Sequence, residues 1–194
     1  MIIGDPSVFA IESKITVAYE KLSFLALGYF TIHVCGHCYG QREPDSTMLG
    51  CSYYAVEQRI AERGKHIAPF AAYAEAGEIA DAVSNAIYAD KQQESYFGIP
   101  HSEFCNIFYT TSNDCMWAPD GDEAFDDGSR VLQFDVEDRV RLIAFRCSEQ
   151  PGREYVHDPA TLSEIWLTAD DFYHILQRWY DAFKSELDAT PKSV

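Results

Sequence analysis

The sequence is short of positive charge and of long apolar runs. Its 194 residues include 15 Lys and Arg against 31 Asp and Glu, a formal net charge of −16. Nucleic acids and anionic membranes are bound through Lys and Arg, so we expect neither as a direct partner. The longest apolar run, residues 24–30, is far shorter than the roughly 20 residues that cross a bilayer. The charge either keeps the protein in solution or steers it toward a basic protein.

We also expect no signal peptide at the N-terminus. The first residues contain no basic region, and Asp5 stands where a signal peptide is apolar. We therefore expect a cytoplasmic protein whose six cysteines are mostly reduced thiols. Cys51, Cys105 and Cys147 lie among apolar residues and are expected to be small buried hydrophobes.

Motifs of several enzyme classes are absent as well. The chain has no G-x-S-x-G nucleophile elbow and no glycine-rich phosphate loop. The six histidines are scattered without a local partner pattern. We expect no catalytic residues and no cofactor. One enzyme hypothesis stays open, a small cytoplasmic enzyme whose Cys–His pair forms only in the fold.

The most conspicuous chemistry present is the sequence CGHC at residues 35–38. A thioredoxin-like thiolate needs a helix N-terminus, whose dipole and free N–H groups lower the thiol pKa. Gly40 and Pro44 follow where that helix would grow, which favours a turn. A zinc site would need two more ligands at a recognised spacing, and none occurs, so we expect no metal. A thiol redox or metal protein centred on Cys35 and Cys38 remains an alternative, and a disulfide between them stays open.

The pattern of apolar residues predicts an α+β fold with a largely antiparallel sheet. Aromatic and β-branched residues followed by CGHC predict a hairpin at about 24–42. Apolar residues at 132, 134 and 136 alternate with polar ones and predict a second hairpin at 130–146, turning at Glu137-Asp138. Segments 47–51, 104–109 and 165–167 are predicted to be shorter strands.

Helical spacing is found in three other segments. Residues 53–63 are predicted to form a helix capped by Ser52 and followed by Gly64, and residues 75–88 a second one. Residues 169–188 are predicted to form a long C-terminal helix, for which Thr168 and Asp171 have capping-box spacing. We expect one domain over residues 1–188 and a flexible tail over 189–194.

A run of acidic residues is the strongest local signal. Eight carboxylates lie between Ala118 and Asp138, namely Asp120, Asp122, Glu123, Asp126, Asp127, Asp135, Glu137 and Asp138. The spacing does not match an EF-hand. Three interpretations remain: a solvated surface, casual cation binding, or a docking patch for a basic protein. Loop composition alone favours the solvated surface.

The N-terminus carries a resemblance to a known family. Gly4-Asp5-Pro6 followed by Phe9-Ala10-Ile11 resembles the opening of the immunity protein 42 family of bacterial polymorphic toxin systems. The stretch WAPDGDEAF at 117–125 and the sequence Trp166-Leu-x-x-Asp-Asp-Phe are similar to later parts of that family. The resemblance covers essentially the whole chain.

The resemblance implies an α+β, non-enzymatic protein that binds and neutralises a cognate toxin C-terminal domain delivered between cells. A basic nuclease domain would attract an acidic inhibitor, and aromatic residues beside the carboxylates would anchor it. The candidate toxin-binding residues are Asp120, Asp122, Glu123, Asp126, Asp127, Tyr53, Tyr54 and Trp117.

Gly4, Asp5 and Pro6 carry over as the family motif, and we interpret them as a structural turn in which Asp5 accepts backbone N–H bonds. The resemblance also implies a tryptophan that is typical of the family, and this is either Trp117 or Trp166. The identity of the toxin, the binding surface and the oligomeric state stay open.

Overall fold

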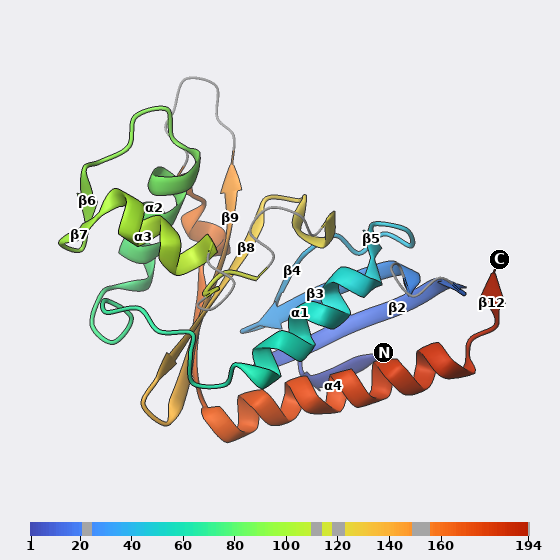
Figure 1. The fold of residues 1–194 in the computed structure, drawn as a ribbon. Helices are drawn as coiled ribbons and strands as arrows, with labels where there is room; N and C mark the ends of the chain where they lie inside the picture. The colour runs from blue at the N-terminus through green and yellow to red at the C-terminus, as the bar shows by residue number, and fades with distance from the viewer. Residues whose placement is uncertain (21–24, 110–113, 118–122, 149–155, 194) are drawn as a thin grey trace.

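The computed structural model describes residues 1–20, 25–109, 114–117, 123–148 and 156–193, and its fold is α+β, as predicted (Figure 1). Its strands are β1 (Ile2–Asp5), β2 (Phe9–Tyr19), β3 (Ala26–Val34), β4 (His37–Tyr39), β5 (Thr47–Met48), β6 (Ser95–Tyr96), β7 (Ile99–Pro100), β8 (Ser129–Val136), β9 (Arg139–Ser148), β10 (Val156–His157), β11 (Ser163–Thr168) and β12 (Lys192–Ser193). Its helices are α1 (Leu49–Ala61), α2 (Ala76–Tyr88), α3 (His101–Tyr109) and α4 (Ala169–Ala189), with 3₁₀ turns η1 (Glu123–Phe125) and η2 (Pro159–Thr161).

The larger sheet is antiparallel in the order β1–β2–β3–β4, and α1 and α4 cover one of its faces (Figure 1). The long strand β2 was not among the predicted strands. It pairs with β3 along nearly its whole length, with a register shift between Ile15 and Val17. At the C-terminus, where a flexible tail was expected, Lys192 and Ser193 pair in parallel with Ala18 and Tyr19.

A second sheet of β8, β9, β11 and β10 separates two hydrophobic cores. Successive side chains of a strand point to opposite faces. Val131 and Leu142 therefore join the core of the larger sheet with α1 and α4, whereas Leu132 and Phe134 join a core formed with α2 and α3. Because both faces are covered, the polar residue Gln133 is fully buried.

Both predicted hairpins and the two longer predicted helices are confirmed. β3 pairs with β4 around residues 35–36, and β8 pairs with β9 around residues 137–138. The prediction of a strand at 165–167 is met by β11. α2 and α4 coincide with the segments 75–88 and 169–188 to within a residue. The Thr168 hydroxyl accepts the backbone N–H of Asp171 at 3.1 Å, the expected N-cap.

One predicted element is wrong, and the bounds of two others differ from those predicted. The segment 104–109 belongs to α3, and Phe104 and Phe108 lie one turn apart and pack on Phe70. A short apolar run does not by its period distinguish a buried strand from a helix. α1 begins at Leu49 rather than after Ser52, and β5 keeps only residues 47–48 of the predicted strand. Leu49 is fully buried, so core packing starts this helix without a side-chain cap.

The cysteine predictions are also corrected by the fold. Cys51 is exposed, because it lies on the solvent side of α1, and Cys105 and Cys147 are only partly buried. Cys115 is the fully buried thiol, packed between α3 and β8.

Candidate functional site

A buried polar network joins the end of α1 to β8 and α4, with Asp135 at its centre. The Asp135 carboxylate accepts the backbone N–H groups of Gly64 at 2.8 Å and His66 at 3.1 Å. It also accepts His66 Nδ1–H at 3.0 Å and the Tyr173 hydroxyl at 2.9 Å. Burial alone would raise the pKa of Asp135, but the bonds from His66 and Tyr173 outweigh it and hold this pKa below its ordinary value. Burial and the nearby Asp135 charge raise the pKa of Tyr173.

Arg59 extends this network toward the core. Its guanidinium is buried and donates to the carbonyl of Met116 at 2.8 Å and to Gln133 Oε1 at 3.2 Å. It also lies 4.3 Å from the centre of the Trp117 ring, a cation–π contact. Burial lowers the pKa of Arg59. Trp117 lies in the hydrophobic core, is only 2% exposed, and packs against Arg59, so it is not the surface anchor that was predicted.

A cleft opens on the solvent side of Asp135. A cavity of about 370 Å³ lies between the end of α1, the tip of the β8–β9 hairpin and the first turn of α4; it is lined by Arg63, Gly64, Asp135, Glu137, Asp138, Arg139, Thr168, Ala169, Asp170 and Tyr173. Arg63, Asp170 and Tyr173 also line a neighbouring cavity of about 480 Å³ along α4. The backbone N–H of Ala169 donates to the Asp138 carbonyl at 2.8 Å, which fixes the hairpin tip on α4.

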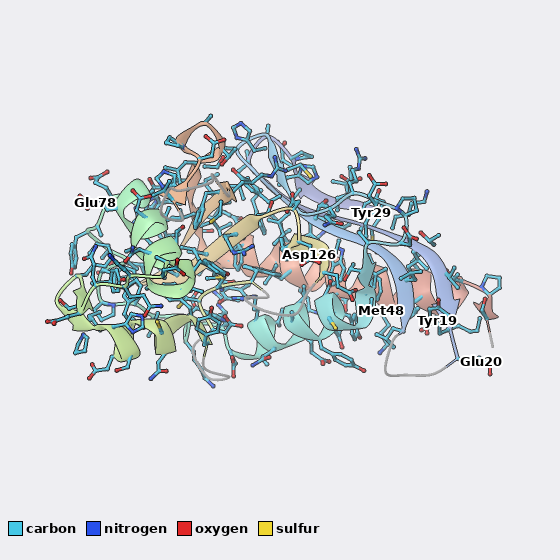
Figure 2. All side chains as sticks on the ribbon, turned by 90° about the horizontal axis from the view of Figure 1, so that it is seen from above. Tyr19, Glu20, Tyr29, Met48, Glu78 and Asp126 are labelled. Carbon is cyan, nitrogen blue, oxygen red and sulfur yellow. The ribbon has the colours of Figure 1, made fainter. Side chains whose placement is uncertain are left out.

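The predicted acidic segment is divided by the structure. Asp120 and Asp122 lie outside the described residues. Glu123 and Asp126 are exposed (Figure 2 labels Asp126). The Asp127 carboxylate instead makes contacts within the protein. It accepts the backbone N–H of Ser129 at 3.0 Å and forms an ion pair with Arg146 at 3.2 Å.

Of the predicted aromatic anchors, only Tyr54 faces solvent, with 49% of its surface exposed. Tyr53 is 9% exposed because α1 directs it toward α4. Its ring stacks on Tyr180 with centroids 4.6 Å apart and contacts Phe183. Tyr53 therefore belongs to the α1–α4 interface.

The CGHC tetrad forms a tight turn. Cys35 and Gly36 have positive φ angles of 52° and 84° between the paired residues Val34 and His37. The Cys35 thiol donates to the Glu164 carbonyl at 3.4 Å. Burial raises the pKa of both Cys35 and Cys38, the opposite of what an activated thiolate requires. Within the residues described, no group of three or more His, Cys, Asp or Glu side chains is arranged to hold a metal ion.

A thiol and an imidazole do meet on α3, where Cys105 Sγ lies 3.4 Å from His101 Nε2. The same nitrogen lies 2.9 Å from the Ala86 carbonyl. A carbonyl oxygen only accepts, so Nε2 carries a proton that it donates to Ala86 and cannot take one from the thiol. Burial also raises the pKa of Cys105. The pair therefore lacks the arrangement of an activated nucleophile.

Comparison with known families gives these surfaces a context. The model of the family described as Immunity protein 42 matches residues 1–182. The chain belongs to this family. As an immunity protein it is an antitoxin, an inhibitor that binds and neutralises a cognate toxin.

A solved structure shares the fold of this immunity protein. CdiI from Burkholderia dolosa AUO158 superposes with a TM-score of 0.54 at 13% sequence identity, covering 94% of this chain and 99% of that one. No curated protein matches the sequence. Among the described residues, no helix is both long enough and apolar enough to span a membrane.

The opening motif of the immunity protein forms the turn between β1 and β2. Gly4 has a φ of 105°, and a Cβ there would lie 2.4 Å from the Phe9 carbonyl oxygen. Asp5 accepts the backbone N–H of Ser7 at 2.9 Å. The Pro6 carbonyl accepts the N–H of Gly36 at 2.9 Å, which joins this turn to the CGHC turn. These contacts favour the structural interpretation of the motif.

The sequence did not predict the cleft or the hydrogen-bonded residues Asp135, His66 and Tyr173 at its base. The sequence shows Asp135 only as one of eight carboxylates between residues 118 and 138, and it gives no pattern that singles out His66 or Tyr173. The three come from β8, from the loop after α1 and from α4, so only the tertiary fold brings them together. The one local signal available was a polar residue inside a strand whose neighbours are apolar, which is typical of a buried and partnered group.

Proposed function

We propose that this immunity protein neutralises its toxin by stoichiometric occlusion, without catalysing a reaction. The family match carries this proposal, because it makes the chain a toxin inhibitor. The chemistry of the thiols supports it, since the pKa of each of Cys35, Cys38 and Cys105 is raised. We place the protein in the cytoplasm, where an incoming toxin acts on its targets.

The toxin domain that we propose as partner is basic, and a nuclease is the class that fits best. The net charge of −16 is the observation that supports a basic partner. A nuclease cleft attracts phosphate, and an acidic inhibitor that docks on or beside that cleft gains association rate from complementary fields. Fast capture matters because the toxin has to be bound before it acts.

The proposed docking surface includes the exposed acidic residues of the predicted segment. Glu123 and Asp126 are exposed on and beside η1, and Tyr54 is exposed on α1. Asp120 and Asp122 remain candidates from the sequence. Exposed tyrosines are common among the residues that dominate binding energy, so Tyr54 replaces Tyr53 and Trp117 as the proposed anchor.

The salt dependence of toxin binding tests this proposal. We expect the association rate constant with the purified cognate toxin domain to fall at least about tenfold between roughly 0.1 and 1 M salt, since the Debye length shrinks from about 10 to about 3 Å. The dissociation rate, set by short-range contacts, serves as the internal control and changes little. Association that is insensitive to salt rejects electrostatic capture.

The stoichiometry of inhibition tests occlusion separately. Toxin activity titrated with the immunity protein should reach its end point at equal molar amounts and recover when the complex is dissociated. Inactivation of a molar excess of toxin would show turnover and contradict occlusion.

A further inference from the structure

The hydrogen bonds of the second sheet define the direction in which the backbone N–H and C=O groups of each β11 residue point. On β8, the Val131 carbonyl and the N–H groups of Gln133 and Asp135 bond to residues outside the sheet. Backbone groups alternate in direction along an antiparallel strand, so the even-numbered residues of β8 bond to β9. On β9, the odd-numbered residues are therefore the ones that bond to β8, and the backbone groups of the even-numbered residues point toward β11. Their partners on β11 are Leu167 for Val140, Ile165 for Leu142 and Ser163 for Ala144.

Glu164, Trp166 and Thr168 consequently direct their backbone groups away from β9. The Glu164 carbonyl accepts the Cys35 thiol at 3.4 Å, in agreement with this direction. The Thr168 carbonyl is at the N-cap of α4, where it starts the helical bonds. The three N–H groups and the Trp166 carbonyl have no hydrogen-bond partner among the described residues. β11 is thus an edge strand with an unpaired row of backbone groups.

Side-chain contacts hold this edge in place. The Trp166 ring lies 4.9 Å from the guanidinium of Arg139 and 5.2 Å from that of Arg141. Trp166 Nε1 donates to Glu164 Oε1 at 3.1 Å. Arg141 is buried, and it donates to the carbonyls of Ala71 and Ala74 at 2.7 and 2.8 Å. An edge held this firmly loses little conformational entropy when a partner binds.

Carboxylates lie beside the same edge, and two of them also form ion pairs with arginines. Glu164 is exposed on β11 itself, and its carboxylate forms an ion pair with the buried Arg141 at 2.7 Å. The Asp138 carbonyl accepts the Ala169 N–H at the strand's end. The side chain of Asp170, one residue further, is 89% exposed and forms an ion pair with Arg63. An extended segment that paired with β11 would meet these carboxylates with its own side chains.

We propose that an extended, Lys- or Arg-bearing segment of the cognate toxin adds to β11 as a further strand. Natural proteins usually block their sheet edges, because unpaired strand groups recruit other chains. Strand addition takes its affinity from main-chain hydrogen bonds and its specificity from alternate side chains. This inference rests on the proposed function, and it names the part of the surface where the toxin's backbone binds.

Amide hydrogen exchange measured by NMR on the full chain, free and with the cognate toxin domain, tests the proposal residue by residue. In the free protein the amides of Glu164, Trp166 and Thr168 exchange fast, whereas those of Ile165 and Leu167 are already protected by β9. Complex formation slows the first three at least about tenfold and leaves the alternate two little changed.

Two substitutions at one outward-facing position give a second measurement. Trp166→Pro removes the outward N–H, and proline is tolerated in an edge strand at such a position. Trp166→Val also removes the ring but keeps the N–H and a strand-forming side chain. We expect Trp166→Pro to bind the toxin domain at least about tenfold more weakly than Trp166→Val, with both variants folded by circular dichroism.

The possible outcomes separate this inference from the proposed function. A complex that leaves the amides of Glu164, Trp166 and Thr168 unprotected overturns strand addition while keeping the immunity function. Equal affinity of the two Trp166 variants does the same. Concentration-dependent protection of these amides without toxin assigns the edge to a second copy of this chain and also overturns it. Absence of any complex refutes the proposed function, and strand addition with it.

Discussion

Asp135 and Asp126 come from the same acidic stretch of sequence, but they lie in opposite environments. The side chain of Asp135 is 7% exposed and accepts hydrogen bonds from two backbone amides, an imidazole and a phenol. Asp126 is exposed on the turn after η1. One carboxylate holds three elements together, and the other is available to a partner. Acidic composition therefore does not separate residues that maintain the fold from residues that are exposed to solvent.

The largest expected effect is at the buried carboxylate. Asp135→Ala leaves His66, Tyr173 and the Gly64 N–H without their acceptor, so we expect the free energy of unfolding to fall by about 3 kcal/mol. The measurement is urea denaturation followed by circular dichroism. Asp126→Ala is the matched control, and it should change stability by less than about 0.5 kcal/mol. Equal effects of the two substitutions would remove the distinction between these carboxylates.

The pH dependence of stability should also show that Asp135 contributes to folding. The folded-state pKa of Asp135 lies below its ordinary value, so its contribution is full above the unfolded pKa of about 3.9 and is lost as pH falls through the folded pKa. We expect the stability of the wild-type protein to decrease below about pH 4. Asp135→Asn should show a shallower decrease between pH 6 and pH 3, measured by denaturant titration at each pH. An unchanged slope would show that Asp135 does not titrate with folding.

The smallest effect on stability is expected at the exposed carboxylates. Glu123→Gln combined with Asp126→Asn should change the free energy of unfolding by less than about 0.5 kcal/mol. At low salt the double variant should associate with the toxin domain roughly two- to fivefold more slowly, because it removes charge from the proposed docking surface.

A distant acidic residue provides the control for that experiment. Glu78 on α2 lies far from Asp126 in the molecule (Figure 2). Glu78→Gln should slow association less than the double variant does, as measured by stopped-flow fluorescence under the same conditions. If Glu78→Gln has an equal effect, net charge and not the local surface controls capture.

Local patterns predicted those elements whose signals are themselves local. The alternation in residues 130–146 and the Thr168 cap identified the β8–β9 hairpin and α4 because turns and caps act over a few residues. The start of α1 and the helical state of Phe104–Tyr109 were missed. Both depend on packing against Phe70 or the sheet, contacts that lie far away in sequence.

By itself, the sequence determined the α+β class, the acidic character and the family, because composition, periodicity and short motifs carry those properties. Only the tertiary structure decided which acidic and aromatic residues face the solvent. The second core, built from α2 and α3, covers the face of β8 and β9 that bears Phe134, while α1 and α4 cover the other, and this buries Gln133 and Asp135. Burial depends on which distant element covers a strand, and no local period encodes that choice.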